Sequence, residues 1–92
     1  MYIKSAKLVF RIEHAASLKD KRHVSRSLID KSRRKFNVSI SEVDTQDAHK
    51  ILTIGVAVVS GSMSHAKKSL DDVIRYLETS TDAELTELDI LY

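Results

Sequence analysis

The chain of 92 residues is long enough for one domain with a single core, and its 42% hydrophobic and 30% charged residues are typical of a globular protein. It contains no cysteine, which excludes disulfides, thiolate-ligated zinc and a cysteine nucleophile. The net charge of +2 is unevenly distributed, since residues 17–37 carry eight basic and two acidic groups. We therefore expect a single domain over residues 1–92 that presents a basic surface.

The N-terminal residues lack the features of a secretory signal peptide. Lys4, Lys7 and Arg11 interrupt the apolar residues of segment 1–14, and no cleavage site of small residues follows it. The best apolar run elsewhere, residues 51–63, is shorter than the roughly 20 residues that a membrane-spanning helix needs. We therefore expect a soluble, cytoplasmic protein without a membrane partner.

The first half of the chain predicts a strand, a helix and a second strand. In residues 6–12 apolar and polar side chains alternate, as in a strand with one buried face. Ser17 is the expected N-cap of the following helix, with Asp20 near its positively charged N-terminus. Asn37 is expected to end this helix, because asparagine adopts the left-handed conformation more readily than most residues. A second strand is expected over residues 38–44.

The second half predicts a strand, a helix and a last strand. Residues 50–59 are rich in β-branched side chains, and Gly55 among them indicates a bulge or a closely packed position. Apolar residues recur at helical spacing over residues 63–78, and alternation returns over residues 83–92. The helical set comprises Met63, Ala66, Leu70, Val73 and Leu77. The last strand has Leu88, Ile90 and Tyr92 on a common side.

This order of elements predicts an α+β fold, the ferredoxin-like βαββαβ two-layer sandwich with two helices on one face of an antiparallel four-stranded sheet. The opposite sheet face, called the open face below, then lacks a covering helix. It is expected to show Val9, Thr53, Ala57 and Val59 beside Lys7 and Arg11. Because this set is too apolar for water alone and too shallow for a deep pocket, a homodimer that pairs two sheets, or association through an edge strand, would cover it.

The basic residues of the first helix are unevenly placed around it. With about 100° per residue and Leu18 at 0°, the apolar side chains occupy an arc of about 140°. Four basic residues fall within about 60° beside that arc, and only Asp30 is close enough in sequence to neutralise them. These four, called the basic stripe below, are Lys19, Arg22, Arg26 and Arg33. Lys21 and Arg34 are predicted to flank them as further contacts to nucleic acid.

Three interpretations of the basic stripe are open at this point. It binds an anionic partner, lies on the solvated side of an ordinary amphipathic helix, or docks on an acidic protein surface. If all four residues contact phosphates, binding should weaken roughly 70- to 150-fold between 50 and 200 mM salt. Base reading as in an RNA-recognition motif is not expected, because residues 50–59 contain no aromatic residue and Phe10 is predicted to face the helices.

Residues 42–49 form the one polar cluster with the composition of a catalytic site. Asp44, Asp47 and His49 could bind a hard metal ion or act as acid and base. The alternative is a hairpin turn, in which aspartate is favoured because it hydrogen-bonds the local backbone. The histidines lack the spacing of metal ligands, and no glycine-rich phosphate loop is present. We therefore favour the turn and expect no catalytic residue, metal or cofactor.

Three segments, SLKDKRHVSRSL, KFNVSISEVDTQD and IGVAVVSGS, resemble the YlxP-like family of small bacterial proteins of largely unknown function. The resemblance extends over nearly the whole chain and implies a ferredoxin-like fold. Thr45 stands where the family usually has histidine, and Ala48 and His49 stand where it often has Leu-Trp. Members are often encoded among translation-initiation and ribosome-maturation genes, so the resemblance implies a ribosome-linked role in small-subunit assembly. It implies no catalytic residue.

The leading hypothesis is a non-enzymatic cytoplasmic factor that binds structured RNA or a ribosomal particle through the basic stripe. The alternative is a homo-oligomeric protein-interaction module that does not bind nucleic acid. An enzyme that uses Asp44, Asp47 and His49 is the third hypothesis.

Overall fold

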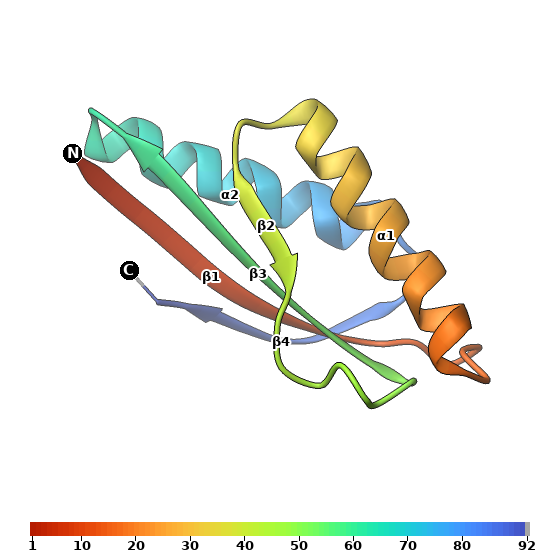
Figure 1. Ribbon diagram of the computed structural model, residues 1–92. Helices are drawn as coiled ribbons and strands as arrows, with labels where there is room; N and C mark the ends of the chain where they lie inside the picture. Colours follow the sequence, from red (N-terminus) through yellow and green to blue (C-terminus); the bar gives the residue numbers. More distant parts are fainter. Residues whose placement is uncertain (92) are drawn as a thin grey trace.

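The computed structural model describes residues 1–91, which form four strands and two helices in the predicted order (Figure 1). The elements are β1 (Tyr2–Arg11), α1 (Leu18–Lys35), β2 (Ser39–Glu42), β3 (Ile51–Ser60), α2 (Met63–Thr79) and β4 (Glu84–Ile90). The strands form one antiparallel sheet in the order β2-β3-β1-β4, and both helices cover the same face of it. The predicted ferredoxin-like sandwich is therefore confirmed.

The two central strands, β1 and β3, form the longest ladder of the sheet. Their register runs from Tyr2 opposite Ser60 to Arg11 opposite Ile51, so β1 begins at Tyr2 rather than at residue 6. β2 and β4 do not reach this far, and the first residues of β1 therefore pair only with the end of β3. The central pair projects beyond the rest of the sheet at this end (Figure 1).

The start of α1 follows the prediction, whereas its end does not. The Ser17 hydroxyl oxygen accepts a hydrogen bond from the Asp20 backbone N–H at 3.2 Å, and the Asp20 carboxylate accepts one from the Ala16 N–H at 2.9 Å. This reciprocal arrangement satisfies N–H groups that have no partner within the helix. At the other end, the chain leaves the helix at Phe36 in an extended conformation, with φ −128°. Asn37 is not left-handed, so its predicted role as a left-handed stop was wrong.

The connection between β2 and β3 begins earlier than predicted, because the chain turns sharply after Glu42. Asp44 and Thr45 have φ angles of 45° and 41°, a left-handed conformation that is strained for a β-branched residue such as threonine. The turn folds over the open face, where the hydroxyl oxygens of Thr45 and Thr53 lie 2.8 Å apart. Thr53, expected on the surface, is therefore buried.

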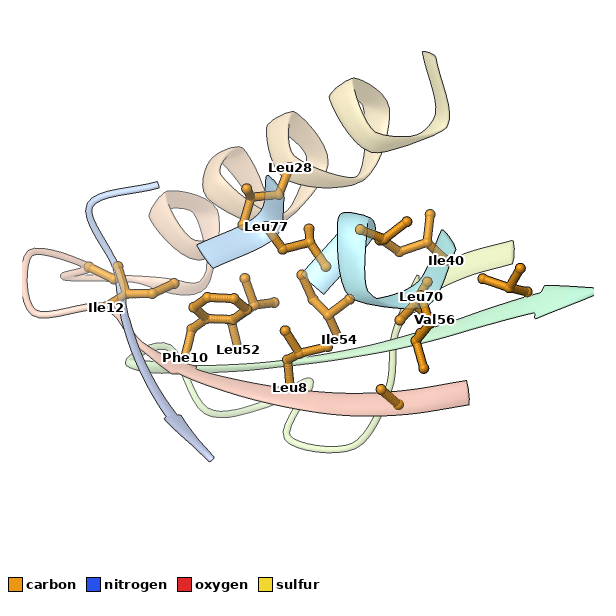
Figure 2. Packing of buried hydrophobic residues seen from close by; sticks show 14 residues of the cluster. Leu8, Phe10, Ile12, Leu28, Ile40, Leu52, Ile54, Val56, Leu70 and Leu77 are labelled. Carbon is orange, nitrogen blue, oxygen red and sulfur yellow. The ribbon is translucent and has the colours of Figure 1, made fainter. Parts of the chain in front are cut away.

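The hydrophobic core fills the space between the helices and the sheet (Figure 2). Phe10 and Leu52 rise from adjacent strands toward α1 and α2, where Leu28 and Leu77 face them. The predicted inner side of α2 is confirmed for Ala66, Leu70, Val73 and Leu77, which are buried. Met63 was wrongly included and is largely exposed, because the first turn of α2 lies over the narrow end of the sheet that only β1 and β3 reach (Figure 1).

β4 lies at the edge of the sheet, outside the area that the helices cover. Leu88 and Ile90 lie opposite Leu8 and Ala6 and so share the helix-facing side, as predicted. Both remain largely exposed, because α1 packs mainly over β2 and α2 mainly over β1 and β3. Tyr92, the third residue predicted on this side, lies outside the described residues.

Candidate nucleic-acid interface

The basic stripe lies on an outer side of α1, next to the edge strand β2. All four of its side chains are exposed. At a rise of about 1.5 Å per residue, the stripe extends about 21 Å along the helix. Arg22, Arg26 and Arg33 line a shallow hollow whose opposite wall includes Ser41 of β2. Three of the four stripe residues therefore line one hollow, and Lys19 is exposed outside its lining.

Arg33 connects this surface to the edge of the sheet. Its Nη2 donates a hydrogen bond to the carbonyl oxygen of Ile40 at 3.0 Å. β2 is an edge strand, so α1 supplies a partner for a backbone group that no further strand can reach. A guanidinium has five N–H donors, and the contact with Ile40 leaves others for a ligand. Arg33 is thus fixed in position while some of its N–H donors remain without a partner among residues 1–91.

Carboxylates are scarce along the stripe. Asp30 lines the same hollow as Arg22, Arg26 and Arg33. Within residues 1–91, none of the four stripe residues forms an ion pair. Arg34 is also exposed, but its position about 100° farther around the helix than Arg33 places it beside the stripe rather than in it. The positive charge of the stripe is therefore available to an external anion.

Lys21 does not belong to this surface, and its predicted contact with nucleic acid was wrong. The residue is only 1% exposed. Its Nζ donates toward the carbonyl oxygens of Thr45, Gln46, Ala48 and Ile51 at 2.7, 3.1, 2.8 and 3.2 Å, an arrangement called the carbonyl cage below. Glu42 Oε2 lies 2.9 Å from the same Nζ. Three ammonium protons cannot satisfy five acceptors, so this Oε2 makes an ion pair without a hydrogen bond of its own.

The sequence contained a signal for this burial that the charge analysis missed. On the helical projection Lys21 falls at about 300°, between Leu28 and Leu18 and therefore inside the apolar arc. The ammonium group of a lysine in that position must either extend out to solvent or be hydrogen-bonded inside the protein. The backbone of the β2–β3 loop supplies those acceptors, and the loop is consequently held against α1.

The polar cluster of residues 42–49 forms this loop. Asp44 is exposed and receives a hydrogen bond from Lys7 Nζ at 3.3 Å, and the Ala48 N–H donates to the Thr45 carbonyl oxygen at 3.1 Å. Asp47 and His49 are exposed. Within residues 1–91, no three histidine, aspartate or glutamate side chains gather as ligands for a metal ion. The loop is a turn organised by Lys21, as the turn interpretation predicted in outline.

Two exposed carboxyl groups elsewhere have altered acidity. The hydrogen bond from Arg11 Nε lowers the pKa of Glu13 below its usual value. The hydrogen bond from Lys68 Nζ, at 2.8 Å, likewise lowers the pKa of Asp72. Neither pair includes a residue of the basic stripe.

Neither helix in residues 1–91 combines the length and the hydropathy that a membrane crossing needs.

Comparison with known proteins gives a family and a fold. Residues 3–90 match a family described as "Protein of unknown function (DUF503)". The chain is 37% identical over 75 residues to a Bacillus subtilis (strain 168) protein named "Uncharacterized protein YlxP". The aligned region covers 82% of each sequence. Among solved structures, it resembles a de novo designed protein with a ferredoxin fold, determined by solution NMR, with a TM-score of 0.64 and 15% identity. That similarity covers 100% of this chain and 87% of the designed one and concerns the fold alone.

Proposed function

This chain belongs to the DUF503 or YlxP-like family of proteins of unknown function, and we propose that it is a non-enzymatic cytoplasmic factor that binds structured RNA through the basic stripe. The observation that carries the proposal is a line of four exposed cations without a carboxylate partner among residues 1–91. A row of this kind matches the phosphates of a nucleic-acid backbone, which supply most of the affinity of sequence-independent binding.

The RNA is proposed to be structured rather than single-stranded, because the hollow that the stripe lines offers bases no aromatic ring to stack on. Recognition of single strands relies on exposed aromatic side chains. Phe10 is completely buried, and Phe36 packs against Tyr76 with ring centroids 5.4 Å apart. Neither ring lies in the hollow that the stripe lines. Contacts from the stripe would therefore follow the backbone of a folded RNA, and the family resemblance makes a ribosomal particle the target to test first.

Charge reversal of Arg22, Arg26 and Arg33 to glutamate tests the proposal. These residues are exposed, so the triple variant should keep the circular dichroism spectrum of the native protein. A matched control reverses three exposed basic residues on other surfaces, Lys31, Lys67 and Arg75, and changes the net charge equally. Co-sedimentation with ribosomal subunits near 50 mM salt should be abolished by the first variant and largely retained by the control.

Unchanged co-sedimentation of the first variant would overturn the proposal. Equal losses in both variants would also contradict it, because binding would then follow net charge rather than the stripe. If the native protein does not bind RNA at low salt and only self-associates, the result would favour the alternative function, a protein-interaction module.

A further inference from the structure

The open face carries an apolar area at the projecting end of the central strands. Ile3 and Val59 lie opposite each other in β1 and β3 and are 50% and 62% exposed. Leu91 lies near them, because its N–H donates a hydrogen bond to the Ser5 carbonyl oxygen of β1 at 2.8 Å. Its side chain is exposed as well. Three apolar side chains exposed together on a sheet face indicate a contact surface rather than a solvated one.

Three of the four residues in the next two rows of this face are small, and the fourth, Lys7, donates a hydrogen bond to Asp44. Ser5 lies opposite Ala57, and Gly55 lies opposite Lys7. A Cβ atom at Gly55 would lie 3.3 Å from Val43 Cγ1, which confirms the predicted close packing at this glycine. The surface is hollowed beside Ser5, Gly55 and Ala57, where Val43 and Leu91 form further walls, and another sheet could approach it.

The opposite end of the open face combines a protrusion with a hollow. The protrusion is the turn at Asp44 and Thr45, which the carbonyl cage of Lys21 fixes from behind. The hollow lies between this turn and β4, and its walls include Val9, Arg11, Thr86 and Glu87. The protrusion therefore stands on the β3 side of the sheet midline, and the hollow extends to the β1–β4 side.

We infer that two copies of this chain form a dimer through the open face, about a two-fold axis that runs parallel to the strands between β1 and β3. This axis places β1 of one copy over β3 of the other, so that Ile3 packs on the partner's Val59. The small residues Ser5, Gly55 and Ala57 allow the two sheets to reach the usual separation of about 10 Å. The turn of each copy enters the hollow of the other, because the same axis exchanges the two sides of the sheet.

The occupant is a second copy because the face is complementary to itself. A two-fold interface requires that each feature and its counterpart lie on the same surface. This face provides both the apolar pair and the matching protrusion and hollow. The two largest principal extents, 42 and 23 Å, set an upper limit of about 970 Å² for a flat face, above the roughly 800 Å² per partner that a stable interface buries.

The dimer would have four layers, with the helices on the outside. The two basic stripes then lie on opposite outer surfaces and contact separate RNA segments. Only this consequence rests on the proposed function, because the dimer itself needs no RNA.

Sedimentation velocity over a concentration series tests the dimer in the absence of RNA. The native chain of 10.4 kDa should sediment as a dimer of twice that mass at about 100 µM. Val59→Lys places two charges in the interface and should weaken dimerisation at least about 100-fold. Met63→Lys adds the same charge on the helix side of the molecule and should leave the dimer intact.

A native protein that stays monomeric up to about 500 µM would overturn the inference, whatever its affinity for RNA. A Val59→Lys variant that still dimerises would also overturn it, as would equal weakening by Met63→Lys.

Cross-linking gives an independent readout, because the chain contains no cysteine. Ser5→Cys lies close to the proposed axis and should give a covalent dimer with a short bismaleimide. Glu78→Cys, on the exposed side of α2, should not. Equal cross-linking of both variants would contradict the proposed geometry.

Discussion

Replacement of Lys21 by methionine should lower the free energy of unfolding by about 3 kcal/mol. Methionine keeps an unbranched side chain of similar length in the apolar arc of α1 but removes the ammonium. The carbonyl cage and the Glu42 carboxylate then lose their common partner. Removing one member of a buried ion pair costs about 3–5 kcal/mol, because the other charge remains without compensation.

The lower end of that range is expected, because the side chain of Glu42 is 18% exposed and solvent partly compensates its charge. A domain of this size has about 5–15 kcal/mol of total stability, so the variant should remain folded but marginal. Each kcal/mol corresponds to about 4–8 °C in melting temperature for 60–100 residues, which predicts a decrease of about 12–24 °C. Amide hydrogens of residues 43–50 should also exchange faster, because the loop loses its anchor.

Urea and thermal unfolding followed by circular dichroism measure this effect. Lys19→Met is the matched control, since Lys19 lies in the same turn of α1 and is exposed; its change should stay within about 0.5 kcal/mol. Adding Glu42→Gln to Lys21→Met removes the uncompensated charge and should restore part of the loss. A Lys21→Met variant within about 0.5 kcal/mol of the native protein would refute the assignment of Lys21 as the anchor of the loop.

Two further predictions concern single charges. Asp30→Asn removes the carboxylate that lies in the hollow of the basic stripe, so it should tighten RNA binding about two- to threefold near 50 mM salt, measured by fluorescence anisotropy; unchanged or weaker binding would contradict the proposed interface. Lys68→Met should raise the pKa of Asp72 toward its usual value, as read from the carboxyl carbon shift in an NMR titration. Because the folded pKa is lowered, the stabilisation from this pair is present above the unfolded pKa and disappears as pH falls through the folded one. An Asp72 titration that does not respond to Lys68→Met would show that another group sets its acidity.

The order and type of the elements could be predicted because each depends on a local pattern. Alternation identified β1, helical spacing identified the inner side of α2, and Ser17 marked the start of α1. The exposure of Leu88 and Ile90 could not be read in the same way. Their alternation is that of a strand with a buried face, but burial depends on where the helices cross the sheet, which only the assembled fold determines.

The candidate site shows the same division between local and distant information. The basic stripe follows from helical geometry alone, and the exposure of its four residues agrees with the projection. Lys21 is different, because its position in the apolar arc predicts burial but not its partners. Apart from the Glu42 carboxylate, those partners are backbone groups 24 to 30 residues away along the chain, and a backbone carbonyl carries no residue-specific signal in a sequence.

Co-sedimentation with ribosomal subunits across a salt series tests the central claim most directly. If the four residues of the basic stripe contact phosphates, the logarithm of the binding constant should fall with the logarithm of salt concentration with a slope of about −3 to −3.6. The Arg22, Arg26 and Arg33 charge-reversal variant should show no binding at any of these concentrations. Binding by the native protein that does not change with salt, or a slope that the variant reproduces, would contradict RNA recognition by this surface.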